Sequence, residues 1–152
     1  PAAGAGAALG ALGLHPAADG DYDAHRLGLG VPDGSRDLEV EKTLLLEAEF
    51  EALQGVDFAK GCYVGQELTA RTKYRGLLKR RLYLVEGDAP LPPPDTPIMC
   101  GAKEAGAMRT SRGRTGLALL RIEQVEAAEA AGEPLMASGV RVRTVPLEWA
   151  NS

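Results

Sequence analysis

The chain has 152 residues, of which 45% are hydrophobic, 25% charged and 5% aromatic, and its formal net charge is −4. These values are typical of a soluble globular protein and argue against a disordered chain and against a nucleic-acid-binding protein. No apolar run approaches the roughly 20 residues of a membrane span, so we expect no membrane partner. A chain of this length can bury about 70% of its unfolded surface, in one core or two small ones.

Residues 1–21 are dominated by alanine and glycine. They contain neither a continuous apolar core nor an Arg-rich amphipathic face, so they do not match a signal or transit peptide. We expect a flexible lead-in. Because the chain starts at Pro1 without a methionine, we also expect it to be a piece of a longer protein.

Residues 44–54 carry the first helical pattern. Leu46, Phe50 and Leu53 lie at three- and four-residue spacing, which predicts a short helix or helix-like segment. Gly55 would end it.

Charge is distributed unevenly along the chain. Acidic residues dominate residues 39–57, whereas residues 68–85 contain no acid. A basic run of this kind is most often a solvated face, but it could receive an anion such as a polyglutamyl or phosphate group. The run consists of Arg71, Lys73, Arg75, Lys79, Arg80 and Arg81.

Residues 60–67 read Lys-Gly-Cys-Tyr-Val-Gly-Gln-Glu. The glycines Gly61 and Gly65 let the backbone turn tightly and approach a ligand closely. Cys62 lies between them, beside a lysine and just before a predicted helix over residues 67–74. A neighbouring cation and a helix N-terminus both favour the thiolate. We therefore interpret Cys62 as a functional thiolate; the alternative is a small buried hydrophobic residue.

The other residues of this motif are assigned supporting roles. Lys60 would keep the thiol deprotonated, and Tyr63 would form a wall of the turn. Gln66 and Glu67 would fix the turn by hydrogen bonds. Glu67 also has a purely structural explanation, because an acid in the first helical turn stabilises a helix and can pair with Arg71 four residues later.

The pattern beyond Gly76 changes to short strands separated by glycines and prolines. Such strands at roughly ten-residue spacing indicate a small antiparallel barrel or sandwich. The fold class is therefore α+β, with a mixed segment over residues 22–76 and an antiparallel β module over residues 77–152, for which the family resemblance given below implies a barrel. We predict strands over residues 80–85, 97–100, 105–109, 117–122 and 140–145.

The two cysteines lie far apart in unlike contexts. Cys100 follows two apolar residues and is predicted to be a core cysteine. A disulfide between Cys62 and Cys100 is one alternative, although two widely separated cysteines are more typical of a protein in a reducing compartment. No His/Cys cluster has zinc-site spacing, and Cys62 alone cannot hold a metal or cluster, so we expect no stably bound metal.

The octapeptide at residues 60–67 resembles the signature of the YgfZ family of folate-binding proteins. These are related to the glycine-cleavage T-protein, an aminomethyltransferase, and include mitochondrial counterparts in iron–sulfur assembly. Residues 25–32 and 55–58 are similar to other family segments, and residues 116–121 to a strand of the family's C-terminal barrel. The resemblance implies that residues 22–76 end a folate-binding, aminomethyltransferase-like domain and that the chain is the C-terminal half of such a protein.

The resemblance implies a folate-associated accessory factor in iron–sulfur cluster assembly or repair, with tetrahydrofolate as cofactor. Its partners would be iron–sulfur assembly proteins or cluster-containing client enzymes. Cys62 would ligate a cluster transiently with a partner's thiols or take part in thiol exchange. Arg26 and Arg75 are the candidates for folate contacts. A bacterial cytoplasm is the favoured compartment, with the mitochondrial matrix as the alternative.

Two other functions stay open. One is a tetrahydrofolate-dependent aminomethyl or methyl transferase. Against it, Gly28 stands where the T-protein has a glutamate that contacts the pterin, and glycine has no side-chain acceptor. The other is a docking module in which the barrel and the basic run bind a partner and Cys62 is incidental. The assembly factor is favoured over the transferase.

Overall fold

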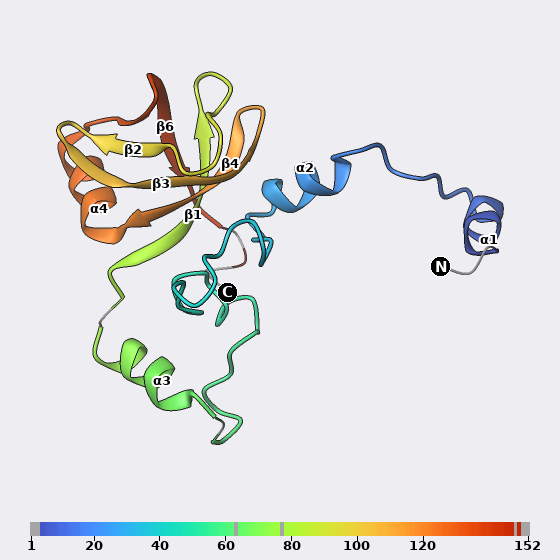
Figure 1. The fold of residues 1–152 in the computed structure, drawn as a ribbon, viewed down its shortest axis with the longest axis horizontal. Helices are drawn as coiled ribbons and strands as arrows, with labels where there is room; N and C mark the ends of the chain where they lie inside the picture. Colours follow the sequence, from blue (N-terminus) through green and yellow to red (C-terminus); the bar gives the residue numbers. More distant parts are fainter. Residues whose placement is uncertain (1–3, 63, 77, 148, 150–152) are drawn as a thin grey trace.

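The structure is a computed structural model that describes residues 4–62, 64–76, 78–147 and 149. Tyr63 therefore lies outside the described residues, and its predicted role stays a prediction. The chain forms a β-barrel from which two helices, α1 (Ala5–Ala11) and α3 (Gln66–Tyr74), extend (Figure 1).

In the part of the chain that the structure describes, six strands close into an antiparallel barrel in the order β1-β4-β3-β2-β5-β6. On β1, Leu84 lies opposite Leu117 of β4 and Val145 of β6, and the pairing with β6 closes the barrel. The predicted antiparallel barrel is confirmed, and the predicted strands overlap β1, β2, β3, β4 and β6. The strands are β1 (Arg80–Gly87), β2 (Pro97–Cys100), β3 (Lys103–Arg112), β4 (Thr115–Arg121), β5 (Leu135–Ala137) and β6 (Val140–Val145).

Strand β4 is buried on both faces, which explains its continuous apolar sequence. Ala118 and Leu120 belong to the cluster inside the barrel. Leu117 and Leu119 belong to a second cluster, together with leucines of β1 and with Leu27 of α2 (Asp21–Gly28). A strand with two buried faces needs no polar alternation. Helix α2 therefore covers the outer face of β4 and completes this part of the core.

The segments before the barrel differ in how they pack. Helix α1 (Ala5–Ala11) buries no residue and projects away from the barrel (Figure 1). Helix α2, in contrast, packs against β3 and β4. Because α2 contacts the barrel, the division of the chain at residues 76 and 77 stays a prediction.

Helix α4 (Ile122–Ala131) and strand β5 are not predicted by the strand pattern. α4 begins directly after β4, so Ile122 is the first residue of a helix and not the end of the predicted strand. It ends at Gly132, which adopts a left-handed φ of 64°. Val125 and Ala128 join the cluster inside the barrel. The alanine and glutamate content of residues 122–131 is the sequence signal for this helix.

The predicted helix over residues 44–54 is wrong. The chain forms consecutive turns there. Glu49 and Gln54 adopt left-handed backbone conformations, with φ of 59° and 58°. A right-handed helix cannot continue through a left-handed residue. The carbonyl of Glu47 instead accepts a hydrogen bond of 2.7 Å from the amide of Leu82, which joins the segment to β1.

A buried ion-pair network fixes α2 to the barrel. Arg26 is only 3% exposed, and its guanidinium donates to Asp23 and to Asp37, both at 2.8 Å. The second carboxylate oxygen of Asp37 accepts the amide hydrogen of Thr110 on β3, also at 2.8 Å. Asp37 thus links the α2 segment to a barrel strand through both of its oxygens.

Arg36 extends this network at the surface through Asp23 and Asp33. Its ion pairs should make the stability of the fold depend on pH in the acidic range. Its hydrogen bonds lower the pKa of Asp33 from 3.8 to about 2, and they lower the pKa of Asp23 still further. A carboxylate whose pKa is lower in the folded state stabilises the fold above its unfolded pKa, and this contribution is lost as the pH falls through the folded pKa.

We therefore expect the thermal unfolding midpoint to fall as the pH drops from about 4 to about 2, and Arg36→Ala to weaken this dependence. Circular dichroism melts across that pH range are the measurement. A variant with the same pH profile as the parent protein would contradict the assignment to Arg36.

Candidate functional site

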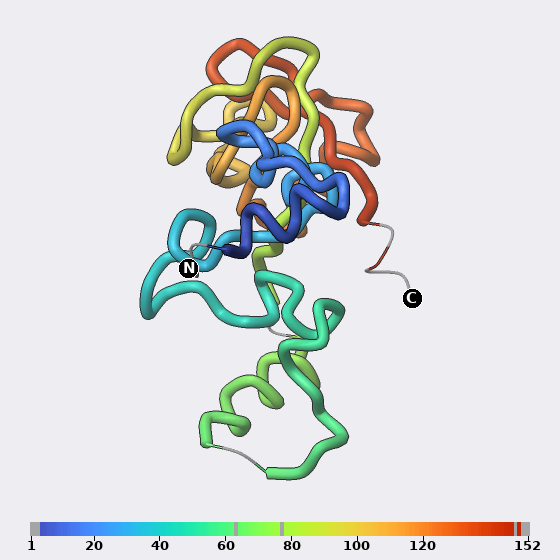
Figure 2. Tube along the Cα trace, turned by 90° about the vertical axis from the view of Figure 1, so that its right-hand side faces the viewer, coloured from blue at the N-terminus to red at the C-terminus, as the bar shows by residue number. Residues whose placement is uncertain are grey.

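Cys62 is exposed, forms no disulfide and lies just before α3. The glycines on either side, Gly61 and Gly65, have left-handed φ angles of 95° and 87°, and Gly65 is the N-cap of α3. A Cβ at either glycine would meet nothing within 4 Å, so the backbone conformation and not crowding requires glycine. The predicted turn and the predicted helix over residues 67–74 are confirmed. Figures 1 and 2 both show α3 lying below the barrel.

The polar residues of the motif lie around this turn. Lys60 is exposed and Gln66 is half-buried, and both take part in interactions of their own. Their predicted roles toward the thiol stay predictions. Glu67 forms an ion pair with Arg71 one helical turn later, which confirms the structural explanation for these two residues.

The end of α3 contacts the chain that precedes Cys62. The ammonium nitrogen of Lys73 lies 4.3 Å from the centroid of the Phe58 ring and also forms an ion pair with Glu51. The Tyr74 ring packs edge-on against Phe58, with 6.0 Å between centroids. These contacts join the two ends of the segment that carries Cys62.

The acidic and basic runs predicted from the sequence face each other in space. Because three cations of the basic run pair with carboxylates of the acidic run, an anion that approached these three would compete with carboxylates of the same chain. The same pairs attach the acidic run to the start of β1 and to α3. They are Glu47 with Arg80 at 3.0 Å, Glu49 with Arg81 at 2.6 Å, and Glu51 with Lys73.

An apolar cleft of about 370 Å³ lies beside the Cys62 turn, between α3 and residues 41–46. Three large apolar side chains that line it are well exposed: Leu45 at 43%, Val64 at 103% and Leu68 at 62%. A group of exposed apolar side chains marks a surface that contacts another protein surface or a ligand.

The two candidate folate contacts lie in different environments. Arg26 is buried, and its guanidinium is bonded to Asp23 and Asp37, so a folate carboxylate would have to displace these acceptors. Arg75 is exposed at the C-cap of α3. The structure does not bring the two arginines into one site, and their assignment to folate stays a prediction.

Cys100, unlike the exposed Cys62, is buried. It lies on β2 inside the barrel, is 8% exposed, and its thiol donates to a carboxylate oxygen of Glu133 at 3.6 Å. Burial, together with the nearby Glu133 charge, raises the pKa of this thiol. The prediction of a core cysteine is confirmed, and both cysteines are free thiols.

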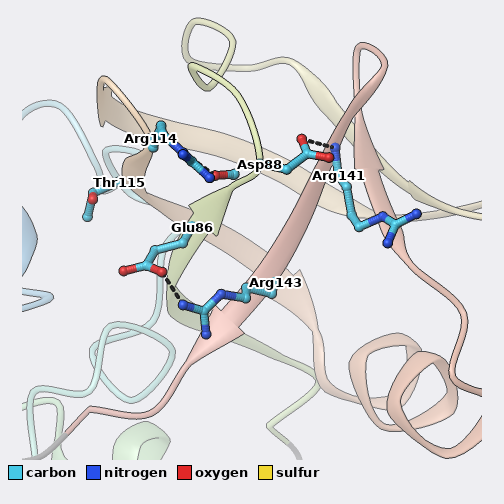
Figure 3. Close-up of a pocket in the computed structure, with 7 residues that line it drawn as sticks. Glu86, Asp88, Arg114, Thr115, Arg141 and Arg143 are labelled. Carbon is cyan, nitrogen blue, oxygen red and sulfur yellow. Dashed lines mark hydrogen bonds and ion pairs between the residues drawn. The ribbon is translucent and has the colours of Figure 1, made fainter.

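A polar hollow of about 340 Å³ lies where the end of β1, β6 and the β3–β4 turn meet (Figure 3). The predicted site residues lie elsewhere: α3 precedes the start of β1, whereas this hollow lies at its end. The contacts in the hollow join neighbouring strands. They are an Arg143–Glu86 ion pair, a bond from the Arg141 amide to Asp88 at 3.1 Å and one from Arg114 Nε to the Gly87 carbonyl at 2.8 Å.

No three histidine, cysteine, aspartate or glutamate side chains among the described residues are grouped so as to hold a metal ion. Within the same residues, every helix is too short or too polar to cross a membrane.

Comparison with known proteins relates the barrel to one family. Residues 79–152 match the family described as CAF17, C-terminal beta-barrel domain, and this range contains the six strands described above. The match agrees with the closed barrel in the structure.

Three curated relatives carry the name of one assembly factor. The human protein named iron-sulfur cluster assembly factor IBA57, mitochondrial, is 42% identical over 111 residues, which cover 70% of this chain and 31% of that protein. The mouse protein of the same name is 39% identical over 112 residues, with 70% and 31% covered. The IBA57 homolog of Neurospora crassa, also named mitochondrial, is 41% identical over 99 residues, which cover 59% of this chain and 23% of the homolog. The chain thus spans about a third or less of the length of these relatives.

Proposed function

We propose that this protein is an accessory factor in iron–sulfur cluster assembly and that the Cys62 thiol is its functional group. The observation that carries the proposal is an exposed free thiol on a glycine-flanked turn, in a chain that is 42% identical over 111 residues to a human protein named as an iron–sulfur cluster assembly factor. The cluster is cargo for such a factor and not a resident cofactor.

The chemistry of a single thiolate limits what Cys62 contributes. Clusters are held by several cysteine thiolates, so one thiol supplies one ligand next to those of a partner protein. A site with a single ligand also releases its cargo easily. Transient ligation, or thiol exchange during transfer, therefore suits Cys62 better than storage of a cluster.

The partner is an iron–sulfur assembly protein or a cluster-containing client enzyme. The apolar cleft between α3 and residues 41–46 supports this, because a partner that covers Leu45 and Leu68 brings its own thiols close to the Cys62 turn. Burial of exposed apolar side chains is the usual source of affinity at such contacts.

Tetrahydrofolate is the proposed cofactor of the whole protein, on the strength of the YgfZ resemblance of residues 60–67. The exposed Arg75 is the better placed of the two candidate contacts. The proposed compartment is the mitochondrial matrix instead of a bacterial cytoplasm, because the three relatives described above are named mitochondrial.

The test is the variant Cys62→Ser in the whole protein. A serine hydroxyl is a poor ligand for cluster iron, so we expect the rate of cluster delivery to a purified [4Fe–4S] apoenzyme to fall by about tenfold or more. The reactivated client activity is the readout, measured with and without tetrahydrofolate. Because Cys62 is exposed, the far-ultraviolet circular dichroism spectrum should not change.

Cys100→Ala is the matched control. It removes the other thiol, which is buried in the barrel, and should leave delivery unchanged. Full delivery by Cys62→Ser would exclude the thiol mechanism and favour the docking-module function.

A further inference from the structure

We infer that Phe58, Lys73 and Tyr74 form a clamp that positions the Cys62 turn for cluster transfer. This inference rests on the proposed function of Cys62 and adds residues outside the glycine-flanked octapeptide. The clamp residues act through the cysteine and are positioning residues.

The contacts of Phe58 with α3 close a loop around Cys62. Phe58 precedes the turn, and its ring meets Lys73 at 4.3 Å and Tyr74 at 6.0 Å at the end of the helix. Between these points the chain passes along α3 to Gly65, where the helix begins (Figures 1 and 2). Cys62 is thus held between the clamp on one side and the helix N-terminus on the other.

Each clamp contact has a favourable geometry. A cation within about 6 Å of a ring centroid is attracted by the negative face of the ring. Glu51 pairs with the same ammonium group and so fixes Lys73 at this place. The Phe58 and Tyr74 rings meet at 68°, an edge-to-face arrangement that aromatic pairs prefer.

The high exposure of Tyr74 shows that its contact with Phe58 is not part of the hydrophobic core. Its side chain is 73% exposed and belongs to neither cluster of the barrel core. Loss of the clamp therefore affects the loop more than the fold. Without it, one end of the loop is released and a smaller fraction of molecules presents Cys62 in the position for transfer, which lowers the observed rate in proportion.

The experiment uses the whole protein with every cysteine except Cys62 replaced, Cys100 by alanine, so that a nitroxide spin label reacts with Cys62 alone. Lys73→Met and Phe58→Leu should raise the mobility of the label in the electron paramagnetic resonance spectrum. In the corresponding unlabelled proteins, cluster delivery to the [4Fe–4S] apoenzyme should fall between about threefold and about tenfold. The thermal unfolding midpoint should not change.

Two further variants distinguish positioning from general loosening of α3. Lys73→Arg keeps the cation over the ring and should restore both the label mobility and the delivery rate. Ala70→Gly lowers the helix propensity of α3 without touching the clamp contacts and should leave both unchanged.

Unchanged label mobility in both Lys73→Met and Phe58→Leu overturns the clamp. Raised mobility with unchanged delivery overturns its positioning role. Failure of the proposed function is seen separately, as full delivery by Cys62→Ser, and the label mobility then still decides whether the clamp exists.

Discussion

Asp37→Ala is expected to lower the free energy of unfolding by about 3 kcal/mol or more, because it removes one of the two carboxylates that pair with the buried Arg26 guanidinium and leaves only Asp23. Asp37 is 1% exposed and Arg26 is 3% exposed. One guanidinium nitrogen of Arg26 is already buried without a hydrogen-bond partner in the described structure. The same change removes the acceptor for the backbone amides of Asp33 and Thr110. Each buried donor without an acceptor adds to the cost.

Chemical denaturation measures the free energy of unfolding. In a thermal melt, we expect the unfolding midpoint of this variant to fall by about 10 °C, given the size of the protein. Asp19→Ala, at an exposed position, is the matched control and should change stability by less than about 0.5 kcal/mol. The double variant with Arg26→Met and Asp37→Leu removes both charges and should recover much of the loss. A loss below about 1 kcal/mol in Asp37→Ala would show that solvent compensates the Arg26 charge.

Gly106→Ala is expected to disrupt the barrel and to lower the free energy of unfolding by about 3 kcal/mol or more. Gly106 lies on β3 opposite Leu120 of β4 and Ile98 of β2, with a φ of 155°. An added Cβ would lie 2.1 Å from the carbonyl oxygen of Leu119 and 2.9 Å from the Cα of Leu120. Both are backbone atoms of the neighbouring strand, so β3 and β4 would have to move apart.

Chemical denaturation and the near-ultraviolet circular dichroism spectrum measure this effect. Gly34→Ala is the matched control, because a Cβ there meets nothing within 4 Å. Its stability should stay within about 0.5 kcal/mol of the parent protein. A Gly106→Ala protein as stable as this control would mean that the two strands are farther apart than the structure places them.

Both substitutions also bear on the candidate site. Among the described residues, the chain that carries Cys62 is joined to the barrel through residues 21–39, which include α2, and through β1. Asp37 fixes the first through β3, and the β3–β4 pairing at Gly106 supports the second through β1. We therefore expect either variant to reduce cluster delivery only as far as it unfolds the protein, in contrast to Cys62→Ser.

Much of the site could be predicted because it depends on local chemistry. Glycine adopts a left-handed backbone at a lower cost than other residues, so Gly61 and Gly65 indicated the turn around Cys62. The helix that follows and the Glu67–Arg71 pair depend on residues one turn apart. The short strands of the barrel likewise follow from alternation and from the glycines and prolines between them.

Local pattern failed where distant contacts decide the conformation. The spacing of Leu46, Phe50 and Leu53 favours a helix, yet this segment forms turns because Glu47 and Glu49 lie against the start of β1. Residues 122–131 have the composition of a helix, but the strands predicted on both sides led us to miss α4. This helix forms where Val125 and Ala128 pack into the hydrophobic cluster of the barrel.

The sequence by itself determined the short strands, the glycine-flanked turn with its cysteine and the resemblance to a folate-binding, iron–sulfur assembly family, because each depends on residues close together in the chain. Closure of the strands into a barrel depends on the distant pairing of β1 with β6. Only the tertiary structure decided which charges are paired and what holds the turn. The basic run faces the acidic run, and Phe58 meets Lys73 and Tyr74. Pairings of this kind depend on where the chain returns in space, which neither composition nor periodicity encodes.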